Sequence, residues 1–126
     1  MNVPQERFSL VARAKSFARA WRGLSVFVRS THNAWVQIVI MIAVFALGWH
    51  YAITRVEWMM IVFACGFVLA AEAFNTAVEI DIDLTSPEYH PYARDTKDVA
   101  AGAVLISAVT AIAIGLIVFF PYVFSA

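Results

Sequence analysis

Three long apolar stretches follow one another along the chain, and they predict membrane-spanning helices over residues 34–53, 58–82 and 99–120. Each stretch has about the 20 residues that an α-helix needs to cross the hydrocarbon core of a bilayer. Residues 4–32 alternate basic and apolar side chains, which is typical of an amphipathic helix lying in the membrane interface. Residues 84–97 are polar and include prolines, so we expect a cytoplasmic loop there. The pattern predicts an all-α integral membrane protein.

The expected ends of these helices follow from proline and from the charged residues that flank the apolar stretches. We expect the second spanning helix to stop at Thr85-Ser86-Pro87, because proline cannot continue a helix. The third is expected to start directly after Lys97-Asp98 and to end at Pro121. The free backbone N–H groups of its first turn, together with Lys97, would then form an anion site suited to phosphate.

Composition supports the membrane assignment, and charge predicts the orientation. The 126 residues are 62% hydrophobic and 14% charged, against roughly 45–50% apolar residues in soluble domains, so residues 1–126 are expected to form one membrane domain. Basic side chains gather before the first span, which predicts a cytoplasmic N-terminus. They are Arg7, Arg13, Lys15, Arg19, Arg22 and Arg29. Because they adjoin a membrane span and form no separate folded platform, nucleic-acid binding has no support.

Four polar residues share one side of the second predicted span, and we call them the polar stripe. At about 100° per residue, Glu72, Asn75, Glu79 and Asp83 fall within an arc of roughly 80°. Glu72 lies about 21 Å along the helix from Trp58, deep in a hydrocarbon core of about 30 Å, whereas Glu79 lies near the surface. A carboxylate at such depth costs about 2.5–3.5 kcal/mol on insertion scales, which predicts a functional site. The alternative is that Glu72 and Asn75 only form hydrogen bonds between helices.

The polar stripe has the parts needed to phosphorylate a hydroxyl group at a membrane surface. Glu72 has the depth to act as general base on a lipid hydroxyl. Glu79 and Asp83, nearer the water, are hard oxygen ligands suited to a Mg²⁺ that stays bound to phosphate. Lys97 supplies a cation for the phosphates. A simple interface pair of Lys97 with Asp98 is the alternative for that part of the site.

Several longer motifs surround the polar stripe. They are Glu72-Ala-Phe-Asn75-Thr-Ala-Val-Glu79, Asp83, Ser86-Pro-Glu88-Tyr89-His90-Pro91, Lys97-Asp98-Val-Ala-Ala-Gly102 and, upstream, Ala20-Trp21-Arg22-Gly23-Leu24 and His32-Asn33-Ala34. Together these motifs resemble the prokaryotic diacylglycerol kinase and undecaprenol kinase family. The resemblance covers nearly the whole chain beyond its first dozen residues.

The resemblance implies a homotrimer of three-span subunits in the bacterial inner membrane, with sites shared between subunits. It also implies Mg²⁺-dependent transfer of the γ-phosphate of ATP to a lipid alcohol, with undecaprenol favoured over diacylglycerol. By matching position, Glu72 resembles the catalytic base and Glu79 a metal ligand. The positions that resemble nucleotide-site residues are Asn75, Asp83, Glu88, Tyr89, His90, Lys97 and Asp98, and those that resemble lipid contacts are Trp21 and Ala101.

Three positions depart from the family pattern. Thr31 stands where the family has a metal-binding glutamate, and a neutral hydroxyl is a much weaker Mg²⁺ ligand than a carboxylate. Gln37 stands where the family often has histidine or glutamate. Asp81 is an acid where the family is usually apolar, but at about 180° from Glu72 it points away from the polar stripe. The sequence therefore predicts a lipid kinase with reduced or altered metal dependence. A weak or inactive relative that binds lipid or nucleotide, and a structural membrane subunit, are the alternatives.

Overall fold

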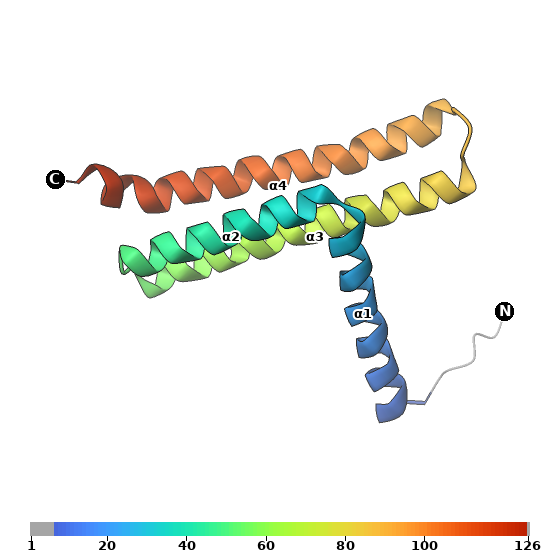
Figure 1. Cartoon of the computed structure of the whole chain (residues 1–126), viewed down its shortest axis with the longest axis horizontal. Coiled ribbons are helices and arrows are strands. Elements are labelled where there is room, and N and C mark those ends of the chain that lie inside the picture. The colour runs from blue at the N-terminus through green and yellow to red at the C-terminus, as the bar shows by residue number, and fades with distance from the viewer. Residues whose placement is uncertain (1–6, 126) are drawn as a thin grey trace.

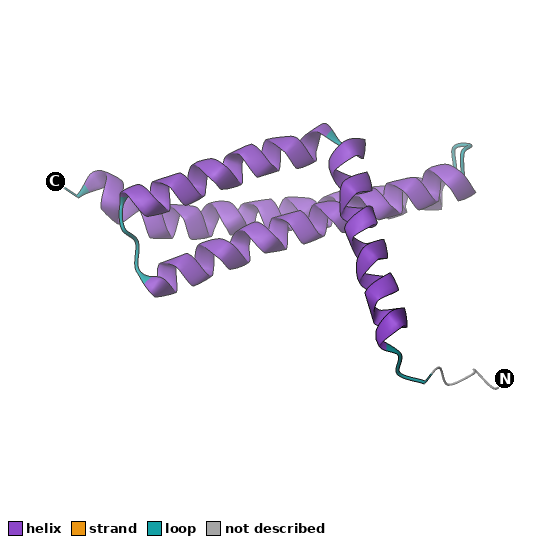
Figure 2. Cartoon of the chain, turned by 60° about the horizontal axis from the view of Figure 1, so that its bottom comes forward, coloured by secondary structure: helices purple, strands orange, loops and turns teal. Residues whose placement is uncertain are grey.

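The computed structural model describes residues 7–125, and this part of the chain folds into helices joined by short connections (Figure 1, Figure 2). In chain order they are α1 (Leu10–Ser30), α2 (His32–His50), α3 (Arg55–Thr85) and α4 (Pro91–Phe124). The last three are long and apolar enough to cross a membrane. The all-α membrane architecture expected from the sequence is thereby confirmed. Residues 4–6 of the predicted interfacial helix lie outside the described part.

Helix α1 stands apart from the other three helices and projects from their side at a steep angle (Figure 1). It begins after Ser9, whose Oγ accepts a hydrogen bond from the backbone N–H of Ala12 (3.3 Å). It ends at Ser30 because Thr31 has extended backbone angles, with φ −134° and ψ 135°. The chain turns at Thr31 and enters α2, so this residue forms the corner between the projecting helix and the bundle.

Threonine caps explain why α2 and α3 begin before the predicted residues 34 and 58. The Oγ1 atom of Thr31 accepts a hydrogen bond from the backbone N–H of Ala34 (3.2 Å). Thr54 does the same for the N–H of Glu57 (3.2 Å). Each cap satisfies a backbone donor that has no partner inside the helix. Thr31 therefore ends α1 and caps α2 at once.

Helices α3 and α4 form an antiparallel pair that makes most of the contacts between helices, and α2 packs along α3. The α2–α3 turn and the last turn of α4 lie at one end of this bundle, which we call the far end (Figure 1). Residues 86–90 join α3 to α4 at the other end, which we call the connection end. Because α2 starts only at His32, α3 and α4 extend beyond it toward the connection end.

The main apolar core lies at the far end of the bundle. Its buried residues are Ile53, Ile61 and Val118. Gly48 of α2 packs directly on the ring of Trp58, since a Cβ added to Gly48 would lie only 2.8 Å from Trp58 Cη2. The tight turn into α3 is formed with Ala52 in the left-handed region (φ 49°). These close contacts fix how α2 meets α3.

The connection between α3 and α4 is much shorter than the predicted loop over residues 84–97, and that prediction was wrong. Helix α3 continues to Thr85 and α4 already begins at Pro91. Proline suits the first position of a helix, because its fixed φ fits there and its missing N–H would have had no partner. His90 caps the helix by accepting the backbone N–H of Tyr92 on Nδ1 (3.2 Å).

Lys97 and Asp98 consequently lie inside α4 rather than at its start. Backbone N–H groups at this position are used within the helix, so the predicted anion site at the N-terminus of a helix starting at Val99 was wrong. The predicted end at Pro121 was also wrong, since α4 continues to Phe124. The missing N–H of Pro121 removes one hydrogen bond near the helix end, and the N–H of Ser125 still bonds the oxygen of Pro121 (3.0 Å).

Candidate active site along α3

Glu72 lies on the buried face of α3, in line with apolar residues of the bundle. It is 4% exposed, and the Gln37 amide of α2 approaches its carboxyl group. Thr76, one turn further along, donates its hydroxyl to the backbone oxygen of Glu72 (3.0 Å). The buried residues of this face are Ile61, Ala64, Val68, Glu72 and Thr76. Burying a carboxyl group is costly unless it is paired, so Glu72 is a candidate for a reacting group, and its approach to Gln37 leaves hydrogen bonding between helices as the alternative.

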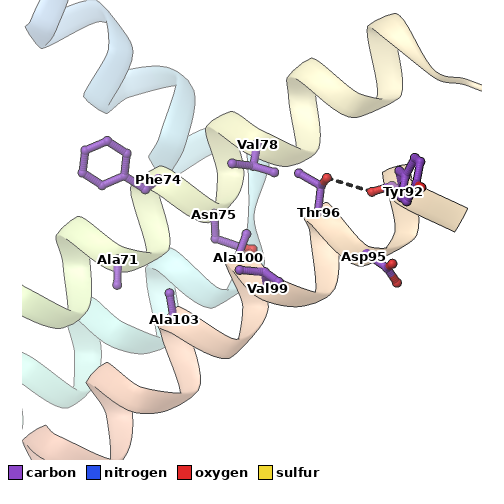
Figure 3. A pocket seen from close by; sticks show the side chains of 10 residues that line it. All are labelled: Ala71, Phe74, Asn75, Val78, Tyr92, Asp95, Thr96, Val99, Ala100 and Ala103. Carbon is purple, nitrogen blue, oxygen red and sulfur yellow. Dashed lines mark hydrogen bonds between the residues drawn. The ribbon is translucent and has the colours of Figure 1, made fainter.

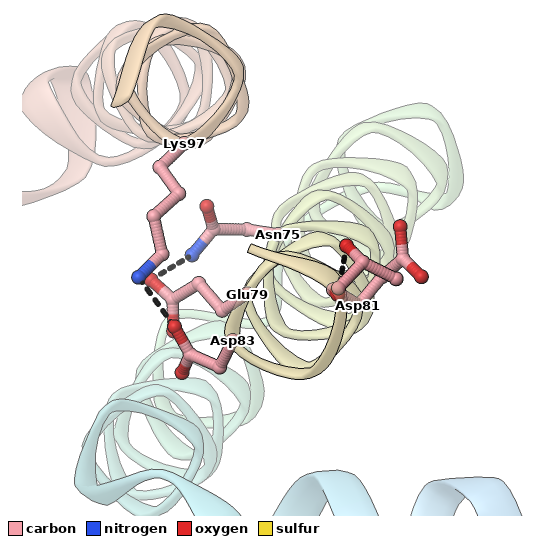
Figure 4. A network of polar contacts seen from close by, with 6 residues as sticks. Asn75, Glu79, Asp81, Asp83 and Lys97 are labelled. Atoms are coloured by element: carbon pink, nitrogen blue, oxygen red, sulfur yellow. Dashed lines mark hydrogen bonds and ion pairs between the residues drawn. The ribbon is translucent and has the colours of Figure 1, made fainter. Parts of the chain in front are cut away.

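Asn75 and Glu79, the next two residues of the polar stripe, contact each other one turn apart on α3. Asn75 Nδ2 donates a hydrogen bond to Glu79 Oε1 (3.4 Å; Figure 4). Glu79 is exposed and Asn75 is half-buried. The Asn75 Oδ1 atom is buried and has no hydrogen-bond partner within residues 7–125. Asn75 therefore orients the Glu79 carboxylate and keeps one acceptor free.

Lys97 of α4 reaches across to Asp83 of α3 and forms an ion pair in which Nζ lies 2.7 Å from Oδ1. Seen along the helices, its amino group lies close to Asn75, Glu79 and Asp83, whereas Asp81 points away (Figure 4). The Lys97 and Asp83 side chains are 39% and 69% exposed, and exposed pairs contribute only about 0–1 kcal/mol to stability. The importance of the pair is geometric. It places a cation beside the Glu79 and Asp83 carboxylates, in the part of α3 that extends past the first residue of α2.

A groove of ≈ 680 Å³ runs between α3 and α4 beside the polar stripe (Figure 3). Alanine and valine side chains form its apolar walls, and Asn75, Asp95 and Thr96 add polar groups to it. Its lining residues are Ala71, Phe74, Asn75, Val78, Tyr92, Asp95, Thr96, Val99, Ala100 and Ala103. A groove with an apolar wall and a few polar groups suits a ligand that is itself amphipathic.

The sequence prediction missed the groove residues Tyr92, Asp95 and Thr96. It placed them in the loop over residues 84–97, where helical periodicity could not be used to decide which side chains share a face. A signal was present, because residues 92, 96, 99 and 103 follow one another at intervals of four, three and four, the spacing of one helix face. Tyr92 and Thr96 are also joined directly, since the Thr96 hydroxyl donates to the backbone oxygen of Tyr92 (2.8 Å).

Four residues predicted for the nucleotide site are not brought to the polar stripe within one chain. Glu88 and Tyr89 are exposed in the connection between α3 and α4. His90 caps α4 through Nδ1. Asp98 is exposed and follows Lys97 directly, which turns it about 100° away around α4. Any role of these four side chains at the polar stripe requires a rearrangement or a second copy.

The two predicted lipid contacts, Trp21 and Ala101, lie on different helices and are both exposed. A hollow of ≈ 570 Å³ lies between α1 and α3, and Gly23, Leu24 and Thr76 help to line it. Neither Trp21 nor Ala101 lines this hollow or the groove between α3 and α4. The structure of one chain therefore does not join these two residues into one lipid site.

Metal-ligating side chains are sparse around the polar stripe. Within residues 7–125, no three His, Cys, Asp or Glu side chains cluster closely enough to hold a metal ion. Thr31 already uses its Oγ1 as acceptor for the N–H of Ala34. Glu79 and Asp83 remain as oxygen donors, and a Mg²⁺ that keeps waters and substrate phosphates needs only one or two carboxylates. The residues fit such an open site and do not form a closed protein cage.

Comparison with known proteins connects this arrangement to one group of membrane enzymes. Residues 18–119 match the family described as prokaryotic diacylglycerol kinase. An undecaprenol kinase from Bacillus subtilis is 37% identical, over 96% of this chain and 98% of the relative. Diacylglycerol kinases from Helicobacter pylori and Synechocystis are 28% and 32% identical, each over 79% of this chain, and over 83% and 58% of the relative. The region that matches the family contains the whole polar stripe and Lys97.

Proposed function

The chain belongs to the prokaryotic diacylglycerol kinase family, whose members are lipid kinases, and we propose that it transfers the γ-phosphate of ATP to the hydroxyl group of a membrane lipid alcohol. One observation carries the proposal: exposure increases along a single side of α3. Glu72 is 4% exposed, whereas Glu79 and Asp83 are exposed. A lipid hydroxyl arrives from the apolar side and a nucleotide from water, so this gradient lets both reach one site.

In the proposed reaction, the alcohol oxygen attacks the γ-phosphorus and the bond from that phosphorus to the bridging oxygen breaks, so ADP leaves. Glu72 accepts the hydroxyl proton as general base. Lys97 stabilises negative charge on the phosphates, and Asp83 holds this flexible side chain in place. Glu79 and Asp83 would hold Mg²⁺, which when bound neutralises charge on the phosphate oxygens. Asn75 orients Glu79 through its hydrogen bond to Oε1.

Undecaprenol is the favoured alcohol in this proposal, and diacylglycerol is the second candidate. The relative named undecaprenol kinase shares 37% identity over 96% of the chain. The two diacylglycerol kinases share 28% and 32% over 79% of it. The difference in coverage and identity supports the ranking, and a side-by-side assay of the two alcohols tests it.

The working form in this proposal is a homotrimer in the bacterial inner membrane, with the N-terminus in the cytoplasm and sites shared between subunits. The basic side chains that precede α2 support this orientation. Sharing of sites is supported by the separation of Glu88, Tyr89 and Asp98 from the polar stripe within one chain. Large apolar side chains such as Phe63 and Phe74 are 67% and 75% exposed, and further copies would cover part of this surface.

A second candidate function is a catalytically weak member of the family that binds lipid or nucleotide. The Thr31 hydroxyl favours this alternative, because it caps α2 and a carboxylate is missing at a position where the family resemblance places a metal ligand. The remaining donors, Glu79 and Asp83, would then hold Mg²⁺ weakly. Under this alternative, nucleotide binds at the polar stripe and the phosphate is not transferred efficiently.

A transfer assay with γ-labelled ATP tests both candidates. The full chain is reconstituted in vesicles that contain undecaprenol or diacylglycerol, with and without Mg²⁺. Labelled lipid phosphate that forms only with Mg²⁺ supports the kinase, and faster labelling of undecaprenol supports the lipid preference. Nucleotide binding without labelled lipid supports the weak alternative. A chain that neither binds ATP nor labels a lipid contradicts both.

A further inference from the structure

A second polar contact joins α3 to α4 at the far end of the bundle, opposite the polar stripe. The Tyr122 hydroxyl donates a hydrogen bond to Glu57 Oε1 (2.9 Å), and this contact is partly buried. The other carboxylate oxygen, Glu57 Oε2, is buried and has no hydrogen-bond partner within residues 7–125. The Tyr122 ring packs against Tyr51, with ring centroids 5.8 Å apart. Tyr122 is therefore held in place by its ring as well as by its hydroxyl.

The two polar contacts between α3 and α4 are separated by nearly the same length of each helix. Glu57 and Asp83 are 26 residues apart on α3, and Lys97 and Tyr122 are 25 residues apart on α4. At 1.5 Å per residue both separations are about 38 Å, which exceeds the roughly 30 Å hydrocarbon core of a bilayer. The contacts thus lie near opposite membrane surfaces, and each closes one end of the helix pair.

Toward the connection end, the packing of α3 on α4 gives little directional information, whereas the far end holds the apolar core with Ile61 and Val118. Half of the residues that line the groove between the helices are alanine or valine, and the groove leaves ≈ 680 Å³ open. Small apolar side chains allow helices to approach closely, but they fit almost equally well after a small displacement. A hydrogen bond is directional. The polar contacts at the two ends therefore add directional constraints on the register of α4 against α3 to the apolar packing.

We propose that Glu57 and Tyr122 are positioning residues that fix this register and thereby place Lys97 beside Asp83. The Lys97–Asp83 pair is itself exposed and therefore weak, whereas the Tyr122–Glu57 contact is partly buried and its acceptor is charged, which strengthens a hydrogen bond. A shift of one residue moves a side chain 1.5 Å along the helix and turns it by about 100°. Such a shift carries Lys97 away from Asp83 and from the groove.

Cysteine cross-linking of the full chain in membranes measures the register without reference to catalysis. Val78 and Thr96 face each other across the groove (Figure 3), so Val78→Cys with Thr96→Cys, in a Cys65→Ala background, reports on the alignment near the connection end. Tyr122→Phe removes only the hydroxyl and should slow formation of the intrachain disulfide by up to about fivefold, the factor that one hydrogen bond typically contributes to the equilibrium between registers. Tyr51→Phe removes a neighbouring hydroxyl and should leave the rate unchanged.

Two Glu57 variants test the same hydrogen bond from the acceptor side, one that keeps the acceptor oxygen and one that removes it. Glu57→Gln keeps an acceptor oxygen for Tyr122 and should cross-link nearly as fast as the parent. Glu57→Leu removes the acceptor and a partly buried charge without opening a cavity, so it should fold and cross-link as slowly as Tyr122→Phe. Parent-like rates in both Tyr122→Phe and Glu57→Leu overturn the proposal. Equal slowing in Tyr51→Phe also overturns it, because it points to loosened packing rather than a lost hydrogen bond.

The consequence for catalysis rests on the proposed function and is measured separately. If Lys97 binds the phosphates of ATP, Tyr122→Phe should raise the KM for ATP severalfold and change kcat less. If Tyr122→Phe slows the cross-link but the parent chain transfers no phosphate, the result contradicts the proposed function alone. If the parent chain is an active kinase but Tyr122→Phe and Glu57→Leu cross-link at the parent rate, the result contradicts the positioning role alone.

Discussion

The Lys97 amino group lies 2.7 Å from the Asp83 carboxylate, and this pair connects two helices at the point where α3 has passed the start of α2. One turn back along α3 from Asp83 lies Glu79, oriented by Asn75. A further two turns back, Glu72 is almost fully enclosed. The pair thus marks the exposed end of a polar path that leads into the bundle.

Replacement of Glu72 by glutamine should abolish phosphate transfer while the protein still assembles. The neutral amide cannot accept the hydroxyl proton, and general base catalysis typically contributes about 10²–10⁴-fold to a rate. Removal of a buried charge should not lower stability. Turnover of the lipid alcohol and size-exclusion chromatography in detergent measure the two effects. Asp81→Asn, on the opposite side of the same helix (Figure 4), is the matched control and should keep its activity.

Introduction of a carboxylate at Thr31 should raise activity when Mg²⁺ is limiting. Thr31→Glu and Thr31→Gln both replace the side chain that caps α2, which costs about 1 kcal/mol of stability, but only glutamate adds a metal ligand. The initial rate is measured over a range of Mg²⁺ concentrations for both variants. We expect a lower half-saturating Mg²⁺ concentration for Thr31→Glu alone. Identical Mg²⁺ curves for the two variants would show that the missing carboxylate is not limiting.

Replacement of Lys97 by methionine should weaken nucleotide binding without destabilising the fold. The side chain length is kept and the cation is lost, so the KM for ATP should rise by about tenfold, as expected when one charge-assisted contact to phosphate is removed. The free energy of unfolding should change by about 1 kcal/mol or less, because the Lys97–Asp83 pair is exposed. Arg94→Met is the control, because it removes another cation from α4. Within the described residues, Arg94 pairs only with Asp95, at the long distance of 3.9 Å, so this variant should leave the KM for ATP unchanged.

Substitution by alanine should change the stability of the protein in opposite directions at Gly48 and at Gly66. At Gly48 the added Cβ would lie 2.8 Å from the Trp58 ring, so Gly48→Ala should destabilise the protein by about 1–3 kcal/mol through overpacking. At Gly66 no atom beyond the neighbouring residues and the local backbone of α3 lies within 4 Å of an added Cβ, and Gly66→Ala should stabilise the helix by about 0.5–1 kcal/mol. Thermal inactivation in detergent measures both. A more stable Gly48→Ala protein would contradict the close contact between α2 and Trp58.

Several features were predictable from the sequence because they depend on local properties of the chain. Hydrophobicity and length alone predict the three spanning helices, and the helical period places Glu72, Asn75, Glu79 and Asp83 on one side of α3. The Thr31 cap was also predictable in principle, since threonine before an apolar run is a common N-cap. The early start of α4 does not follow from the prediction of a loop over residues 84–97, because that prediction rests on prolines, whereas proline is also favoured in the first turn of a helix.

Only the tertiary structure decided which residues from different helices meet. The reach of Lys97 to Asp83, the bond of Tyr122 to Glu57 and the groove beside Asn75 all depend on the register and crossing of α3 and α4. The contrast between enclosed Glu72 and exposed Glu79 depends on where α2 begins beside α3. A sequence pattern shows which face of a helix is polar, but contacts between helices arise from packing of residues that are distant in the chain. The sequence thus determined the helices and the polar stripe, and packing determined the geometry of the candidate site.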